Sequence, residues 1–376
     1  MIQQSNAIPN IERLNNIMDR EGIDALVLRS GVNFTYLSGV VYPGTLARHL
    51  DLADSPRGVV LVWPRLGEPA LVLNSFAAPL ARRDSAIGNI VQYDDYGESV
   101  YSKTAEILTQ MGLNNSSLGF EKNSLSAVRW EEIHSLFPSG NIRDCSSLMD
   151  EVRRVKTARE VAILEEAADL LDEAYLEVFA DVKVGDTERE VHGKLLESCI
   201  RRGAGWAHGI LNSSRNSVIY GGEGDMSFQK GDIIRNDYVA YYQGYPGHQS
   251  RTVVVGEPSE DQKTTYRLVR DAYRATIEQC VPGVQAQEIH RFASEAFRNA
   301  GFSDSLALAG HSVGPWWHQQ PPFLVPGSNV ELESGMVLAL EPHIRFWHLQ
   351  DMVLVTDHGP RLLSKRFSTD EMLVVG

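Results

Sequence analysis

The sequence predicts a two-domain α/β protein, of the α+β kind, whose second domain contains an internal twofold repeat. Three observations carry this prediction. The chain has 376 residues, enough for two domains at about 100–200 residues each. Helix-like and strand-like segments alternate over residues 10–145. Two later stretches, 185–204 and 283–302, share one pattern of glycines, acidic residues and histidines.

Residues 1–148 are expected to form the first domain. Its first helix is predicted at 11–22, where four apolar side chains share one face and Gly22 provides a common helix stop. Short apolar runs rich in Val and Leu predict strands at 24–28, 57–63, 69–74 and 116–121. This alternation of elements is typical of a compact α/β domain.

A long charged segment connects the first domain to the rest of the chain. Residues 149–182 have amphipathic, helical periodicity and many Glu and Arg residues. We expect a long helix there, with its charged residues on a solvated face. This helix begins a second domain, which covers residues 149–376.

The second domain contains the repeat. Gly185, Glu190, His192 and Gly203 recur 98 positions later as Gly283, Glu288, His290 and Gly301. Gly231 and Asp237 recur 104 positions later as Gly335 and Glu341. Two related halves that face each other would bring the two carboxylates together. The repeat-equivalent histidines are expected to be packing or surface residues.

Composition restricts the classes of partner and location. The net charge is −14, from 49 acidic and 35 basic residues, which argues against a nucleic-acid or anionic-membrane partner. The three cysteines are widely spaced without a CxxC motif, so no disulfide framework is expected and a cytoplasmic location is favoured. The N-terminal residues show no secretory-signal pattern and no run of about 18 apolar residues occurs, so neither a signal peptide nor a membrane span is expected.

Two carboxylates and two histidines are the first candidates for chemistry. Asp237 and Glu341 lie in apolar strands, where an unpaired carboxylate is costly. An ion pair between Asp237 and Arg235 or Arg251 is the structural alternative. His311 and His318 lie in GHSVGPWWHQQPP (310–322), just upstream of Glu341. Their Trp- and Pro-rich surroundings are typical of a pocket wall.

The motifs of the chain resemble a known family over most of its length. They are IERLNNIMDREGIDALVLRSGVNFTYLSGV (11–40), VRRVKTAREVAILEEAADLLDEA (152–174), GD-x4-D (231–237), GY-x5-RT (244–252), GHSVG (310–314), GMVLALEP (335–342) and DMVLVTDHG (351–359). Their order is similar to that of the pita-bread metallopeptidases: methionine aminopeptidase, aminopeptidase P, prolidase and the non-peptidase creatinase. The resemblance implies a creatinase/prolidase-like N-terminal domain and a C-terminal pita-bread catalytic domain with pseudo-twofold symmetry.

The resemblance also implies a set of metal-ligand positions. The family's peptidases hold two divalent metals with Asp, Asp, His, Glu and Glu. These positions match Asp237, His248, His311, Glu341 and Gln350. The two changed positions are those whose carboxylates bridge both metals. Because a neutral imidazole offers one lone pair and an amide one uncharged oxygen, neither replaces a bridging carboxylate. A dinuclear pair is therefore not expected.

Further positions depart from the family pattern. The substrate-side His of the family falls on Gly221, and an Arg that precedes its last Glu falls near His348. A catalytic Glu of creatinase falls on Ser250. His318, by contrast, matches the second pocket His of the prolidases.

The first of three functional hypotheses is a creatinase-like hydrolase without a metal. It would cleave a C–N bond of a small, cationic nitrogen compound. His248 or His311 would act as general acid or base, because imidazole titrates near neutral pH. Glu341 and Asp237 would orient it or bind the substrate, and His318 completes the catalytic candidates.

Two alternatives remain open. A single Zn, Fe or Mn could be held by His248, His311 and Glu341, with Asp237 as a fourth ligand, and support hydrolase, Xaa-Pro dipeptidase-like or lyase chemistry. The fold could otherwise serve as a non-catalytic binding module.

The substrate is expected to be a small molecule. The substrate-binding candidates are Tyr220, Tyr245, Trp316, Trp317, Phe346, His348 and Gln350, and aromatic rings over a cation would stabilise it. Plain core packing is the alternative for each ring. The resemblance implies a homodimer in which Arg48 or His49 could reach the partner's pocket.

Overall fold

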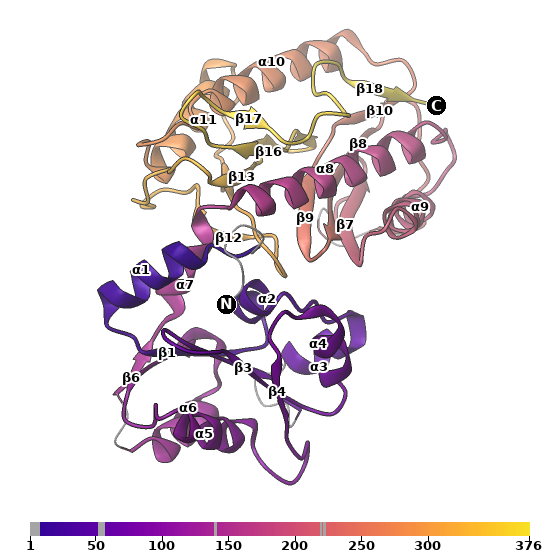
Figure 1. Ribbon diagram of the computed structural model, residues 1–376. Coiled ribbons are helices and arrows are strands. Elements are labelled where there is room, and N and C mark those ends of the chain that lie inside the picture. Colours follow the sequence, from indigo (N-terminus) through magenta and orange to yellow (C-terminus); the bar gives the residue numbers. More distant parts are fainter. Residues whose placement is uncertain (1–7, 52–56, 139–140, 219, 221–222) are drawn as a thin grey trace. The chain divides into compact units, whose positions relative to one another are not determined.

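The structure, a computed structural model, describes residues 8–51, 57–138, 141–218, 220 and 223–376, without the side chains of Thr45, His49 and Asp51. It divides into two compact units, Met1–Arg153 and Arg154–Gly376. Figure 1 shows the elements of both units. The division into domains 1–148 and 149–376 stays a prediction.

The first unit is built on a six-stranded mixed sheet with strand order β4-β3-β2-β1-β5-β6. The strands are β1 (Ala25–Arg29), β2 (Val60–Pro64), β3 (Ala70–Leu73), β4 (Asn89–Gln92), β5 (Ser117–Phe120) and β6 (Asn141–Asp144). The helices are α1 (Ile11–Glu21), α2 (Val32–Ser38), α3 (Gly44–Asp51), α4 (Ala78–Asp84), α5 (Val100–Gln110), α6 (Ala127–Leu136) and α7 (Ser146–Arg154). The four strands expected from the sequence are present as β1, β2, β3 and β5.

Local sequence explains where α1 begins and ends. The Asn10 side chain accepts a hydrogen bond from the Arg13 N–H, which caps the first turn. Gly22 ends the helix in a left-handed conformation with φ +62°, which a glycine adopts without steric cost. The apolar face buries Leu14, Ile17 and Met18.

The long helix expected over 149–182 is instead two helices, α7 and α8 (Ala158–Phe179). The chain is extended between them because Val155 pairs with Met336 and the Lys156 N–H donates to the Gly335 carbonyl. Thr157 then starts α8 with a capping box to Glu160. Tertiary strand pairing therefore overrides a continuous helical pattern.

The second unit contains two five-stranded sheets. One has the order β18-β10-β8-β7 with β9 paired to β8, and the other has the order β12-β11-β13-β16-β17. The strands are β7 (Trp206–Ser213), β8 (Ile233–Tyr242), β9 (Tyr245–Gln249), β10 (Val253–Val255), β11 (Gly310–Ser312), β12 (Gln320–Phe323), β13 (Val337–Leu340), β14 (His343–Ile344), β15 (Trp347–His348), β16 (Asp351–Leu354), β17 (Arg361–Leu362) and β18 (Leu373–Val375). The remaining helices are α9 (Glu188–Arg201), α10 (Glu260–Ile277) and α11 (Ala286–Asn299).

The repeat predicted from the sequence is present in the structure. Helix α11 begins and ends 98 positions after α9, and β13 begins 104 positions after β8. Each half has its own core: α8 and α9 pack with β8, whereas α10 and α11 pack with β13 and β16. In Figure 1, α8 runs beside β8 and β9, and α10 lies over the yellow strands of the other half.

The repeat glycines share a conformation as well as a position. Gly231 and Gly335, which precede the two carboxylate strands, have φ values of +89° and +91°. This left-handed turn favours glycine, so both strands start from the same backbone geometry. The fold thus delivers Asp237 and Glu341 from equivalent elements.

A short bridge joins the two sheets beside those carboxylates. The backbone N–H groups of Ser250 and Gln350 each donate to the other's carbonyl, at 3.2 and 3.1 Å. The buried Arg251 guanidinium reinforces the junction by donating to the Gln350 carbonyl at 2.7 Å and to Asp351 at 2.7 Å. This junction fixes the distance between the two halves where the candidate site lies.

The state of the cysteines and the hydropathy of the helices complete the description of the fold. Cys145, Cys199 and Cys280 are buried as free thiols. None of the helices in the described ranges combines the length and the apolar character needed to cross a bilayer.

Candidate active site

Antiparallel strands β8 and β9 bring Asp237 and His248 together. His248 pairs with Val239 across the ladder, so Asp237 is its diagonal neighbour on the same face of the sheet. The His248 Nε2–H donates to Asp237 Oδ1 at 3.0 Å. Both side chains are largely buried, with exposed fractions of 2% and 11%.

The other half contributes His311, Glu341 and His348. His311 lies on β11 opposite Ala339 of β13, and Glu341 follows the end of β13. Glu341 Oε1 lies 3.2 Å from His311 Nε2, and its Oε2 lies 3.8 Å from His348 Nε2. The ring of His311 stacks on that of His248, with centroids 5.4 Å apart. The two repeat carboxylates therefore meet in one histidine-rich cluster, as symmetry predicts.

Several polar atoms of this cluster are buried without a hydrogen-bond partner among the described residues. They are His248 Nδ1, His311 Nε2, Glu341 Oε1, both ring nitrogens of His348 and Gln350 Nε2. Buried polar atoms are normally paired, because desolvation without a partner costs about 1–3 kcal/mol each. Such a concentration in one place indicates a site built for a ligand.

The tautomer of His311 indicates that the ligand is a cation. Its Nδ1 lies 2.8 Å from the Ser312 carbonyl, so Nδ1 carries a proton and donates. In a neutral ring Nε2 then presents a lone pair to Glu341 Oε1. Two acceptors facing each other at 3.2 Å repel unless a cation, either a proton or a metal ion, lies between them.

A second group of rings extends the cluster toward solvent. His318 lies 4.5 Å from His248 between ring centroids, and Trp317 stacks on His208 at 5.7 Å. The His318 N–H donates to the Tyr241 hydroxyl, and that hydroxyl lies 3.1 Å from His318 Nδ1. Burial raises the pKa of Tyr241, so the hydroxyl stays protonated and donates to Nδ1.

Burial keeps several of these imidazoles neutral. It lowers the pKa of His208 to about 4, with a further contribution from His248. Burial also lowers the pKa of His318 and of His348 well below the usual range. Burial is the largest single influence on Asp237 and opposes its ionisation, but the hydrogen bond from His248 and the electrostatic interactions with His248 and the neighbouring histidines together outweigh it and leave the Asp237 pKa below its usual value. The site thus combines ionised carboxylate with neutral ring nitrogen.

The predicted aromatic residues are distributed differently. Trp317 is 42% exposed and Tyr220 is 71% exposed, and Tyr220 lies under the Arg235 guanidinium at 5.8 Å. Tyr245 is buried and donates to Glu160 at 3.1 Å. Trp316 adopts φ +71° beside Trp317, and Phe346 is half-buried in the β14–β15 turn. Among the described aromatic candidates, Trp317 is the one whose ring contacts join it to the histidines.

The remaining predicted positions also have definite places. Gln350 accepts a hydrogen bond from the Ser250 hydroxyl at 2.9 Å. Gly221 and the His49 side chain lie outside the described residues. Arg251 pairs with Asp351 and Asp172, so the partner of Asp237 is His248 and not this arginine. His192 and His290 bond to Tyr238 and to the Leu306 carbonyl, both away from the cluster.

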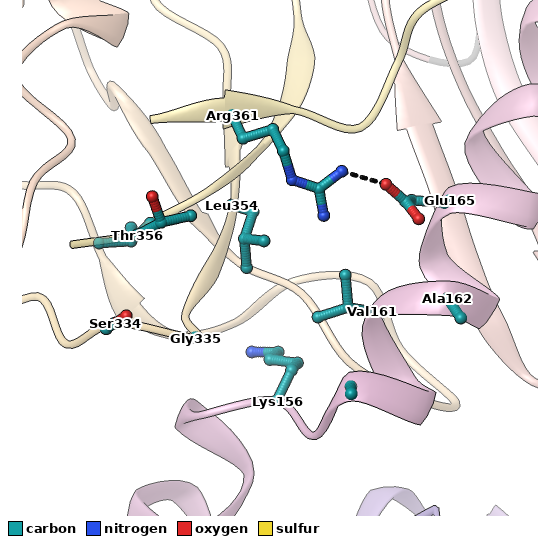
Figure 2. Close-up of a pocket in the computed structure, with 11 residues that line it drawn as sticks. Lys156, Val161, Ala162, Glu165, Ser334, Gly335, Leu354, Thr356 and Arg361 are labelled. Atoms are coloured by element: carbon teal, nitrogen blue, oxygen red, sulfur yellow. Dashed lines mark hydrogen bonds and ion pairs between the residues drawn. The ribbon is translucent and has the colours of Figure 1, made fainter. Parts of the chain in front are cut away.

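A separate pocket opens elsewhere in the same unit (Figure 2). It has a volume of about 430 Å³ and lies between the start of α8 and the ends of β13, β16 and β17. In Figure 2, Arg361 points to Glu165, with which it forms an ion pair, and Lys156 lies on the opposite side of the pocket from Arg361. Lys156 also donates to the Ser312 hydroxyl at 2.8 Å, next to His311. The described lining residues do not include a member of the histidine cluster.

Two models of known protein families match this chain. The model of metallopeptidase family M24 matches residues 162–357, and that of the creatinase/prolidase N-terminal domain matches residues 10–155. The chain belongs to metallopeptidase family M24. It is therefore a hydrolase of the M24 peptidase family, and the predicted fold class and enzyme class are confirmed.

Relatives within the M24 family cover nearly the whole chain. An Xaa-Pro dipeptidase of Pyrococcus furiosus is 27% identical over 367 residues, which are 94% of this chain and 97% of the relative. An uncharacterized peptidase of Bacillus subtilis is 26% identical, covering 97% and 99%. The solved prolidase structure from Pyrococcus furiosus is 26% identical with a TM-score of 0.76, covering 93% of this chain and 99% of that one. An X-Pro aminopeptidase structure from Thermotoga maritima, 20% identical, has the same fold at a TM-score of 0.83 and covers 97% and 99%.

These relatives are named as peptidases, which favours one of the functional hypotheses drawn from the sequence over the others. The creatinase-like hypothesis was the first choice from the sequence, and the comparisons favour the peptidase alternative instead.

The M24 resemblance implies a pair of divalent metals, and the residues present do not fit a pair. Of the five ligand positions, Asp237 and Glu341 alone are carboxylates. Two divalent cations would leave two positive charges uncompensated among buried side chains, which is costly. One divalent cation would be balanced by the two carboxylates. The unpartnered nitrogen and oxygen atoms therefore fit one ion.

Two residues beside the cluster, His208 and Tyr241, were not predicted from the sequence. His208 lies on β7, which pairs with the strand that carries Asp237, and Tyr241 orients His318. A strand prediction over 206–213 would have placed His208 beside β8. His348, which was expected to bind substrate, offers a ring nitrogen within 4.8 Å of an oxygen of each of the two carboxylates.

Proposed function

We propose that this protein hydrolyses the amide C–N bond of a small, dipeptide-sized substrate at the cluster of Asp237, His248, His311, Glu341 and His348. The observation that carries the proposal is the set of buried, unpartnered nitrogen and oxygen atoms where the two halves meet. Relatives named Xaa-Pro dipeptidase make Xaa-Pro dipeptides the first substrate class to test.

The residues of the chain supply the groups that amide hydrolysis needs. Water must lose a proton as its oxygen adds to the carbonyl carbon, and the leaving nitrogen must gain one as the C–N bond breaks. Glu341 and the His248–Asp237 pair can hold and return that proton. A divalent ion bound among Asp237, Glu341 and the imidazoles would lower the pKa of water or polarise the carbonyl.

The wall of rings favours a compact substrate. Trp317 and His208 stack on each other beside His318. The His318 ring in turn lies 4.5 Å from the ring of His248 and 5.9 Å from that of His311, between centroids. An apolar face of this kind packs against a flat, cyclic side chain such as proline. Positional constraint from such packing lowers the barrier by holding the scissile bond near the cluster.

A substrate panel with matched variants tests the function. Purified protein supplied with Zn²⁺, Mn²⁺, Fe²⁺ or Co²⁺ is assayed with Xaa-Pro dipeptides, other dipeptides, Xaa-Pro tripeptides and creatine. We expect Xaa-Pro dipeptides to be cleaved, with His311→Ala and Glu341→Gln each reducing kcat/KM by ~100-fold or more. His290→Ala, a histidine outside the cluster, is the control with unchanged activity. Cleavage of creatine alone, or no cleavage by the folded protein, would overturn the proposal.

A further inference from the structure

His348 is the member of the cluster to which the proposed function gives no individual role. Its ring is 1% exposed, and neither ring nitrogen has a hydrogen-bond partner among the described residues. Its position falls near an arginine of the M24 pattern, so the family's ligand set does not include it. A fully buried, unpaired imidazole is costly in a core, which indicates that a ligand completes it.

The backbone holds this ring firmly in place. The His348 N–H donates to the Thr252 hydroxyl at 3.1 Å, and that hydroxyl donates to the His348 carbonyl at 3.1 Å. The ring packs against that of His343, tilted by 40°, with centroids 4.6 Å apart. A ligand that is fixed from behind in this way is pre-organised, as metal-binding side chains generally are.

Three side chains converge in front of the ring. Asp237, Glu341 and His348 each offer an atom, and these atoms all lie within 4.8 Å of one another. Ligand atoms about 2.0–2.2 Å from one ion are ~3–3.5 Å apart, so small side-chain movements close the site. Glu341 faces His348 with one oxygen and His311 with the other.

We propose that Asp237, Glu341 and His348 bind one divalent transition-metal ion, with His348 as a ligand that the M24 pattern lacks. The two carboxylates neutralise the ion, and the imidazole replaces part of the donor capacity lost at His248 and Gln350. Imidazole favours Zn²⁺, Fe²⁺ and Co²⁺ over Mg²⁺ and Ca²⁺. His311, whose Nε2 faces Glu341, is placed to join as a fourth ligand.

This inference rests on the proposed function for its setting, but its test measures binding and not turnover, so the two can fail separately. Protein stripped with a chelator is titrated with Zn²⁺ by calorimetry and with Co²⁺ by visible absorption. The variants are His348→Ala, His348→Gln and the control His290→Ala. Thermal unfolding of each metal-free protein establishes which variants fold.

We expect the wild type and His290→Ala to bind one ion with the same affinity. His348→Ala should weaken binding at least ~10-fold and change the Co²⁺ absorption band, because water replaces a nitrogen ligand. If His348→Ala fails to fold, His348→Gln keeps the volume and should show the same loss. Wild-type affinity and an unchanged Co²⁺ band in a folded His348 variant would overturn the assignment, whatever the activity.

Discussion

Two buried carboxylates of this chain, Asp237 and Glu121, have different surroundings. Asp237 is paired with an imidazole, whereas Glu121 of the first unit is enclosed with a single strong partner. Its Oε1 accepts from Asn33 Nδ2 at 2.6 Å, and its Oε2 has no partner among the described residues. Burial raises the pKa of Glu121 to about 7, although Asn33, Arg153 and Arg29 act in the opposite direction.

Glu121 should make the stability of the first unit depend on pH. Between about pH 4.3, the unfolded pKa, and about pH 7, the folded state binds more protons than the unfolded state, so the free energy of unfolding falls as pH rises. Glu121→Gln should remove that decline, a relative gain of roughly 3–4 kcal/mol at pH 8. Denaturant unfolding of wild type and variant at pH 5, 6, 7 and 8 measures it.

The exposed Glu131 on α6 provides the matched control. Glu131→Gln should leave the pH profile of the wild type unchanged. Parallel profiles for the wild type and Glu121→Gln would show that Glu121 is ionised in the folded state throughout.

The two substituted ligand positions can be restored at the residue scale. His248→Asp together with Gln350→Glu returns two carboxylates to the cluster and balances a second divalent cation. Metal bound at saturation should then rise from one ion to two per chain, as counted by plasma mass spectrometry. The control is His290→Asp with Gln287→Glu, which adds the same charges on α11. No gain in the restored protein would mean that 248 and 350 are not the bridging positions.

At the scale of elements, β9 is held against α8 by a residue without a side chain. A Cβ built at Gly247 would overlap the backbone carbonyl of Ala167 on α8. Gln249 then donates to the Ala168 carbonyl at 2.8 Å and locks the two elements together. Since His248 lies between these residues, the close approach of β9 to α8 also positions the candidate site.

Gly247→Ala should therefore displace β9. We expect a loss of about 1–3 kcal/mol in the free energy of unfolding, as for other overpacked cores, with weaker metal binding. Gly193→Ala is the control, because no atom lies within 4 Å of a Cβ there and the residue is inside α9. That change should stabilise the protein by about 0.5–1 kcal/mol. Equal effects of the two substitutions on unfolding would contradict the packing argument.

At the scale of the whole molecule, the internal repeat explains why the sequence could predict that two carboxylates meet in one site. The positions of α1, β1, β2, β3 and β5 followed from their apolar patterns, and the meeting of Asp237 with Glu341 followed from the equivalence of the halves. The break at 155–157 could not be foreseen, because it depends on pairing with Met336, far along the chain. The place of His348 depends on the β14–β15 hairpin, whose two-residue strands leave little periodic signal.

The homodimer that the resemblance implies also concerns the whole molecule, and it stays a prediction. Light scattering of the purified protein should give twice the mass of one chain. The mass of a single chain at micromolar concentration would remove the suggestion that Arg48 or His49 reaches a partner's site.

The decisive measurement is the number of metal ions per chain at saturation. The protein is stripped, incubated with excess Zn²⁺ or Mn²⁺, desalted and analysed by plasma mass spectrometry against protein concentration. Because two buried carboxylates balance one divalent cation, we predict one ion per chain in the wild type and less than one in His348→Ala. Two ions per chain, or none bound to the folded wild type, would contradict the single-ion centre.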